Sequence, residues 1–137
     1  MLKAIASGLA GACAVTLMNE TIRQVDEGAP RLDVLGMRAL SKVTDGDHLR
    51  AKAMGSDIVA NTLYYAIVAA GPAEKAPLCG LAMGFGAGLG AVALPGHMGL
   101  GNDTTNRDTK RRVLSVVYYT TAGLFAGMLF QKLASRE

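Results

Sequence analysis

The sequence has no tryptophan and few other aromatic residues, and charged residues make up only 18% of its 137 positions. Soluble domains carry about a quarter charged residues, and large side chains supply most of the free energy of burying a soluble core. The apolar half of this chain is instead rich in Ala, Leu, Val and Met, with 17 Gly beside them. Small residues let helices approach closely within a membrane. The composition therefore favours a membrane protein over a soluble domain.

Cysteine is nearly absent as well, with only Cys13 and Cys79. If the helices run as predicted below, Cys13 lies in the middle of the membrane and Cys79 near one surface. The two depths differ by more than disulfide geometry allows. We interpret both cysteines as small apolar residues, which say nothing about a redox compartment.

Signatures of chemistry are also missing. His48 and His97 occur in separate loops without a companion Cys or a paired His, so neither predicts a metal or haem site. No Ser has a His that the sequence places nearby. The glycine-rich stretch 84–88 lies in an apolar segment without a preceding strand or a Lys, which excludes a nucleotide loop. We therefore predict no catalytic residue, cofactor or metal.

Four apolar segments predict an all-α fold, an integral membrane four-helix bundle that forms a single domain over residues 1–137. The segments cover residues 2–18, 57–70, 78–94 and 113–133. The Gly71-Pro72 and Pro95-Gly96 pairs are expected to end the second and third. Both of these segments are short for a bilayer, so a buried hairpin of a soluble protein is the alternative. The near absence of charge inside all four segments favours the membrane. The first segment is expected to be a retained helix, because charged, helix-compatible residues follow it where a signal peptide needs a cleavage site.

The first loop predicts a short amphipathic helix along the membrane surface. Leucines at 32, 35 and 40 and Val43 recur at helical spacing after Pro30, while basic residues occupy the other side. The stretch Thr44-Asp45-Gly46-Asp47 is similar to a capping box and predicts that the next helix begins near Asp45.

Lysine and arginine are distributed unequally between the two predicted faces. The termini and the 71–77 turn hold 4 of the 14, and the two long loops hold the other 10. Basic residues favour the cytoplasmic side, so we expect external termini and cytoplasmic long loops. The run Lys110-Arg111-Arg112 directly precedes an apolar segment and has no aromatic residues interleaved, which indicates a topology signal rather than a nucleic-acid site.

Glycines recur at four-residue spacing and predict close helix packing. The helix-packing candidates are Gly80, Gly84, Gly88, Gly123 and Gly127. They fit either an interface between copies of the chain or packing among its own four helices.

Polar residues inside or beside the predicted helices all fall in the half of the bundle that carries the basic loops. Burying such groups is costly and needs a reason. The candidate ligand-binding residues of a pocket at that face are Glu20, Arg23, Asp57, Asn61, Tyr65, Tyr118 and Tyr119. The alternative is a structural network, since Glu20 and Arg23 lie one helical turn apart and Tyr is common at bilayer interfaces.

The stretch from Gly8-Leu9-Ala10-Gly11 through Glu20 to Pro30-Arg31 resembles the opening of small bacterial inner-membrane proteins of the YagU-like group. The resemblance covers about 24 residues of motifs that are generic to membrane helices. It implies a multi-pass protein of the bacterial inner (plasma) membrane and assigns no activity or site residue.

Three functions fit these observations. The leading expectation is a non-enzymatic accessory or structural subunit that packs through its Gly/Ala-rich faces, with membrane lipids, other membrane subunits or its own copies as partners. The second is a small transporter or channel-like homo-oligomer that uses the polar pocket, and the third is an enzyme acting on lipid. The ionisable groups all lie within a turn or two of the predicted membrane boundary, which favours the accessory function over ion-coupled transport.

Overall fold

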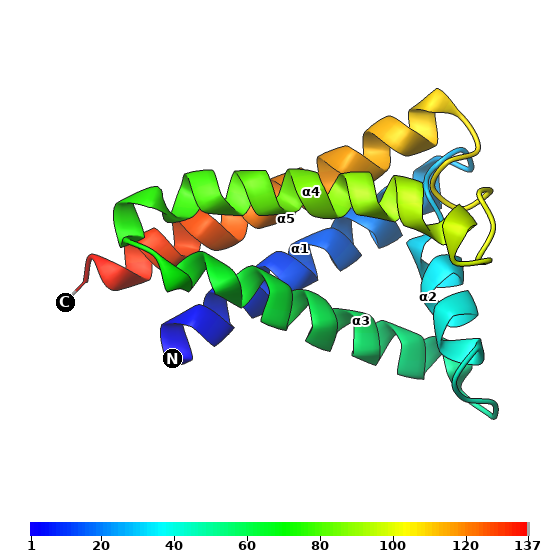
Figure 1. The fold of residues 1–137 in the computed structure, drawn as a ribbon, viewed down its shortest axis with the longest axis horizontal. Coiled ribbons are helices and arrows are strands. Elements are labelled where there is room, and N and C mark those ends of the chain that lie inside the picture. Colours follow the sequence, from blue (N-terminus) through cyan, green and yellow to red (C-terminus); the bar gives the residue numbers. More distant parts are fainter. Residues whose placement is uncertain (137) are drawn as a thin grey trace.

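The computed structural model describes residues 1–136, and that part of the chain is helical with no strand (Figure 1). The long helices are α1 (Leu2–Val25), α3 (Leu49–Ala66), α4 (Ala76–His97) and α5 (Thr109–Ala134). A shorter helix, α2 (Leu32–Ser41), follows α1, and the 3₁₀ turns η1 (Ile67–Ala70) and η2 (Ala73–Lys75) join α3 to α4. The all-α prediction is confirmed for these residues, and α2 is the expected short helix of the first loop.

Three stretches are long and apolar enough to cross a membrane: Leu2–Val25, Ala73–His97 and Thr109–Ala134. They contain the first, third and fourth predicted segments. The second predicted segment, residues 57–70, covers the end of α3 and the η1 turn. The helix α3 is not among the apolar stretches, and Arg50, Lys52 and Asp57 occupy its first half. Three spans are therefore supported by length and composition, and the fourth is not.

The long helices pack in the order α4, α5, α1, α3, each one along the next. The two outer members, α3 and α4, make little contact with each other. They meet near the η1–η2 connection and diverge toward the end where α2 lies (Figure 1). The expected four-helix bundle is thus not confirmed, because the fourth side of the arrangement stays open.

Apart from Tyr65, Tyr118 and two valines, the most buried apolar side chains are small, and many large apolar side chains point outward. Ala12, Ala122 and Ala126 are at most 1% exposed, whereas Leu63 is 65% exposed and Phe85 50%. In a soluble protein the large apolar side chains are the ones removed from water. This reversed distribution is what a helix assembly surrounded by lipid requires, because lipid tails solvate large apolar side chains while small residues allow close packing.

The predicted packing glycines lie in one interface, between α4 and α5. A Cβ added at Gly84 would overlap the carbonyl oxygen of Tyr119, and one at Gly88 would overlap the backbone of Val116. Added Cβ atoms at Gly80 and Gly123 would each overlap the other residue's carbonyl, and one at Gly127 would meet the backbone of Ala76. The chain therefore uses this glycine face to hold two of its own helices together.

The start of α3 differs from the sequence prediction. The helix begins at Leu49 rather than near Asp45, and His48 precedes it in the left-handed region with φ of 63°. Gly46 also has a positive φ of 125°, which prevents a continuous helix from Asp45. The Thr44 hydroxyl contacts the carbonyl oxygen of Asp45, so it does not form the expected capping box.

The expected stop at Pro95-Gly96 is also wrong, because α4 continues through Pro95 to His97. Proline lacks the N–H that would bond to the carbonyl four residues earlier, here Ala91. The hydroxyl of Thr105, a fully buried residue, donates to that Ala91 oxygen at 2.6 Å. The loop after α4 thus satisfies the acceptor that proline frees, and the helix survives.

Candidate functional site

A groove of about 560 Å³ opens between α3 and α4, where the two helices diverge. Its walls come from α3 and α4, and Tyr119 of α5 also lines it. At the end of the molecule where α2 lies, the groove is closed by α2 and by residues 98–100, which follow α4. The lining residues are Leu32, Leu35, Gly36, Ala39, Asp57, Ala60, Asn61, Tyr64, Gly86, Ala87, Gly90, Ala91, Leu94, Pro95, Met98, Leu100 and Tyr119. The wall that α4 contributes is entirely apolar, whereas the α3 wall carries the polar groups.

Asp57 and Asn61 lie one turn apart on the α3 wall, and Tyr64 follows one turn later. The Asn61 side-chain amide donates to the backbone carbonyl of Asp57 at 3.0 Å. The carboxylate of Asp57 forms no ion pair with any residue in the described range 1–136. Asp57 is half-buried and is the one titratable carboxyl on the groove surface.

Tyrosine hydroxyls hold the helices around the groove in place. Tyr64 donates to the carbonyl oxygen of Met83 at 2.9 Å and thereby connects α3 to α4. Tyr65 donates to the carbonyl oxygen of Tyr119 at 2.9 Å and connects α3 to α5. The rings of Tyr64 and Tyr65 meet edge to face with centroids 5.4 Å apart, which restricts both side chains.

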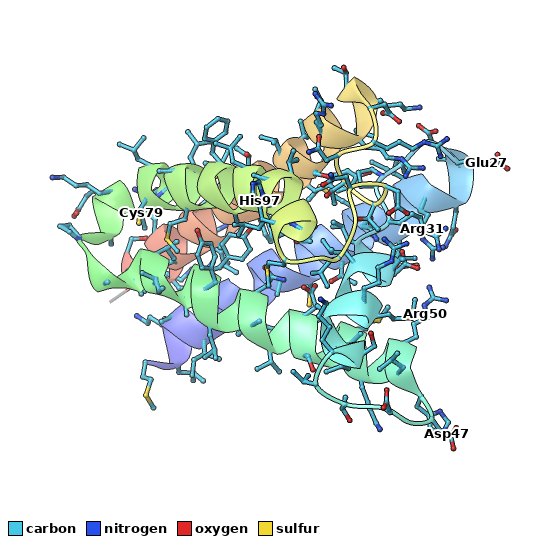
Figure 2. All side chains as sticks on the ribbon, turned by 45° about the vertical axis from the view of Figure 1, so that its right-hand side comes forward. Glu27, Arg31, Asp47, Arg50, Cys79 and His97 are labelled. Carbon is cyan, nitrogen blue, oxygen red and sulfur yellow. The ribbon has the colours of Figure 1, made fainter. Side chains whose placement is uncertain are left out.

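A network of ion pairs connects α1, α2 and α3 at the polar end of the molecule. Glu20 pairs with Arg23 at 2.6 Å and with Arg50 at 3.6 Å, while Asp33 pairs with Arg31 at 3.1 Å. Figure 2 shows Arg31 and Arg50 at this end, with Cys79 toward the opposite end of α4. Burial of Asp33 disfavours its charge, but the hydrogen bond from Arg31 and the nearby positive charges outweigh it and lower the pKa of that carboxyl.

A second, smaller cavity of about 30 Å³ lies behind Asp57, between α1, α2 and α3. Asp57 borders both this cavity and the groove, and Glu20 and Arg50 of the ion-pair network contribute to its wall. Asn19 also lines it and is 3% exposed, with a side-chain carbonyl oxygen that accepts no hydrogen bond within residues 1–136. A cavity of this volume has room for one or two water molecules.

The loop between α4 and α5 holds α2 across the end of the groove. Arg38 of α2 donates to both carboxylate oxygens of Asp103, at 2.7 and 3.0 Å, and to the carbonyl of Leu100. Lys42 donates to the carbonyl of Met98, and Arg111 of α5 donates to the carbonyl of Asp103. The hydrogen bonds from Arg38 lower the pKa of Asp103 to about 2.

The structure divides the predicted site residues into three groups. Asp57, Asn61 and Tyr119 meet at the groove, and Glu20 borders the smaller cavity beside its partner Arg23. Tyr65 is fully buried among helices and Tyr118 is 1% exposed, and neither lines the groove. The tyrosines at 65 and 118 therefore belong to the interior.

Sequence reasoning missed the contribution of Tyr64, Asp33 and Arg50. Tyr64 is separated from Asp57 by seven residues, which places both on one helical face, so the spacing pointed to Tyr64 rather than Tyr65. Asp33 and Arg50 join the ion-pair network only through the folding of α2 and α3 onto α1. No local spacing in the sequence predicts that contact.

Comparison with known proteins gave no matching family model, no matching curated protein and no matching solved structure.

Proposed function

We propose that this chain is a non-enzymatic integral membrane protein that binds an amphiphilic molecule in the groove between α3 and α4. The observation that carries the proposal is the two-sided character of the groove. Its α4 wall is formed by Gly86, Ala87, Gly90 and Ala91, while its α3 wall presents Asp57 and Asn61. Binding sites for small molecules combine apolar walls with a few convergent polar groups in this way.

We further propose that α3 crosses the membrane together with the three apolar helices. Both termini lie at the same end of the molecule, opposite α2 (Figure 1). If α1 crosses away from that end, the chain must return across the same layer before α4 begins. Between α1 and α4, only α3 with η1 runs from the end with α2 back to the end with the termini (Figure 1). The protein then crosses four times, with the termini external and the long loops cytoplasmic, as the distribution of basic residues favours.

The location that fits this topology is a bacterial inner membrane. Its support is the resemblance of residues 8–31 to the YagU-like proteins, together with the unequal distribution of basic residues.

The glycine faces give less support to an accessory function than the sequence indicated. Their surfaces pack α4 against α5 within one chain, so Gly80, Gly84 and Gly88 are not available to a partner. On α4, two glycines that do not pack against α5, Gly86 and Gly90, line the groove. A partner's transmembrane helix seated on this wall is therefore the second candidate, and it uses the same groove.

Filling the groove tests the proposal. A Cβ added at Gly86 meets no atom within 4 Å and Gly86 lines the groove, so Gly86→Phe is expected to fill part of the groove. Gly55 of α3 is equally unobstructed but does not line the groove, so Gly55→Phe is the matched control. We expect native mass spectrometry of the wild type, purified in mild detergent, to show a retained lipid or other amphiphile. Gly86→Phe should lose it and Gly55→Phe should keep it.

Each alternative outcome has a clear meaning. A stoichiometric protein subunit that is lost on Gly86→Phe would replace ligand binding by the helix-docking function. Retention of the same molecules by all three proteins would contradict the proposed function.

A further inference from the structure

The charge of the groove selects among amphiphiles. Asp57 is its one ionisable carboxylate, and none of the lining residues is Lys, Arg or His. An anionic head group at this point would meet a like charge with no basic side chain to offset it. A neutral head group would leave the carboxylate without a partner in a membrane environment, where such groups are costly.

Several other acids near the polar end are paired, whereas the exposed Glu27, Asp45 and Asp47 have no ion pair among residues 1–136. Glu20, Asp33 and Asp103 each contact an arginine, and Asp26 contacts Lys110 at 2.5 Å. Asp57 differs from both sets, because it is half-buried at the groove and the part of the chain that the structure describes supplies it with no cation. An ionisable group inside a membrane protein is normally paired, so the missing partner points to a ligand.

The polar neighbours of Asp57 carry no charge that would neutralise its carboxylate, although the Asn61 amide lies within hydrogen-bonding reach of it. The Asn61 amide and the Tyr64 hydroxyl each donate to a backbone carbonyl, of Asp57 and Met83 respectively. Tyr64 and Tyr119 both line the groove, so aromatic rings and a carboxylate share its surface. Aromatic faces and carboxylates are the groups that proteins use to bind organic cations.

We infer that the amphiphile in the α3–α4 groove carries a cationic ammonium group, which lies against the Asp57 carboxylate where Tyr64 and Tyr119 line the groove. This inference rests on the proposed function. The apolar part of the ligand follows the α4 wall past Gly86, Gly90 and Leu94. The ammonium of a zwitterionic lipid and a free amphiphilic amine share the required chemistry.

The test uses the full chain in a nonionic maltoside detergent with three photoreactive probes. All have the same alkyl chain and end in a trimethylammonium, a hydroxyl or a sulfate group. We expect the trimethylammonium probe to label groove residues with roughly tenfold higher apparent affinity than the hydroxyl probe, and the sulfate probe to label them least. Asp57→Asn should remove the preference, and Asp57→Glu should largely retain it.

Asp47→Asn is the matched control, because Asp47 carries an exposed carboxylate that forms no ion pair within residues 1–136 and does not line the groove. It should leave the preference for the trimethylammonium probe unchanged. Equal labelling of the wild type by the ammonium and hydroxyl probes would overturn the inference even if Asp57→Asn did not fold. If Gly86→Phe nevertheless abolished the labelling by both probes, the proposed binding of an amphiphile in the groove would stand, without the preference for a cation.

Labelling that Gly86→Phe does not reduce for any probe would instead contradict the proposed function itself.

The mass of the molecule retained from the native membrane separates the two ligand sources. A phospholipid with an ammonium head group or a smaller amine supports the inference, and an anionic lipid without one contradicts it.

Discussion

Two glycines on α4 that are only two residues apart face different surroundings. Gly84 lies against the backbone of α5, where an added Cβ would overlap the Tyr119 carbonyl, whereas Gly86 faces the open groove. The glycines predicted to pack on α4 are Gly80, Gly84 and Gly88, and all three lie against α5. Gly86 was not among the predicted packing residues, and the sequence did not indicate that it lines a groove.

Substitution by alanine distinguishes these two environments. Gly84→Ala should lower the free energy of unfolding by about 1–3 kcal/mol, because the backbones of α4 and α5 must separate to admit the methyl group. Gly86→Ala should raise it by about 0.5–1 kcal/mol, since glycine is unfavourable inside a helix and no atom obstructs the new Cβ. Denaturant unfolding in detergent measures both, and equal effects would contradict the observed packing.

The adjacent residues Thr104 and Thr105 are both buried but differ in whether their hydroxyl groups form a hydrogen bond. The Thr105 hydroxyl satisfies the Ala91 carbonyl that Pro95 leaves free, whereas the buried Thr104 hydroxyl has no partner within residues 1–136. Thr105→Val should cost about 1–3 kcal/mol because it orphans a buried acceptor. Thr104→Val should be neutral or stabilising, since it removes an unsatisfied polar group. Thermal unfolding of the two variants compares them, and a larger loss for Thr104→Val would refute this role of Thr105.

Among the elements, α2 depends most on contacts far along the chain. Its amphipathic pattern predicted a short helix along the membrane surface, and Leu32–Ser41 forms a short helix. Its attachment to the loop after α4, through Arg38 and Asp103, has no counterpart in local spacing because 65 residues separate the pair. Sequence patterns thus predicted that the helix exists but not that it closes one end of the groove.

Acid should weaken the attachment of α2. The hydrogen bonds from Arg38 lower the pKa of Asp103 to about 2, from an ordinary value of 3.8. Because the folded-state pKa is the lower one, the pair stabilises the folded protein above about pH 4, and this contribution is lost as the pH falls toward 2. The thermal midpoint of the wild type should therefore fall more steeply between pH 4 and pH 2.5 than that of Asp103→Asn.

Asp47→Asn is the control for this comparison, because Asp47 is exposed and forms no ion pair within the described chain. Its pH profile should match that of the wild type. If Asp103→Asn has the same steep profile as the wild type, the pair does not contribute to stability in this pH range.

The element that the sequence described least well is α3. Its apolar part, residues 58–70, spans about 21 Å as helix and 3₁₀ turn, less than a hydrocarbon core of about 30 Å. Asp57 lies about 12 Å along the axis from Leu49, about a third of the way to the end of η1. Composition alone therefore does not identify α3 as a membrane span. The proposal that it crosses rests on its two ends, which lie at opposite ends of the molecule (Figure 1).

For the whole molecule, composition and apolar segments predicted the all-helical fold and three of its long apolar helices. They did not predict that α3 and α4 diverge, because that angle depends on which helices share the Gly-rich contacts. Gly8 packs closely on α3 at Thr62, and Gly84 packs closely on α5, so each outer helix is held to an inner one and not to the other. The groove follows from this pairing.

The central claim is that α3 crosses the membrane and carries Asp57 with it, and cysteine accessibility in sealed vesicles tests it most directly. In a background of Cys13→Ala and Cys79→Ala, single cysteines replace Asp45, Glu74, Arg107 and Ser135. The four-crossing topology predicts that an impermeant thiol reagent labels positions 74 and 135 from one side, the external one, and positions 45 and 107 from the other. Labelling of positions 45 and 74 from the same side would show that α3 does not cross, and would contradict the account.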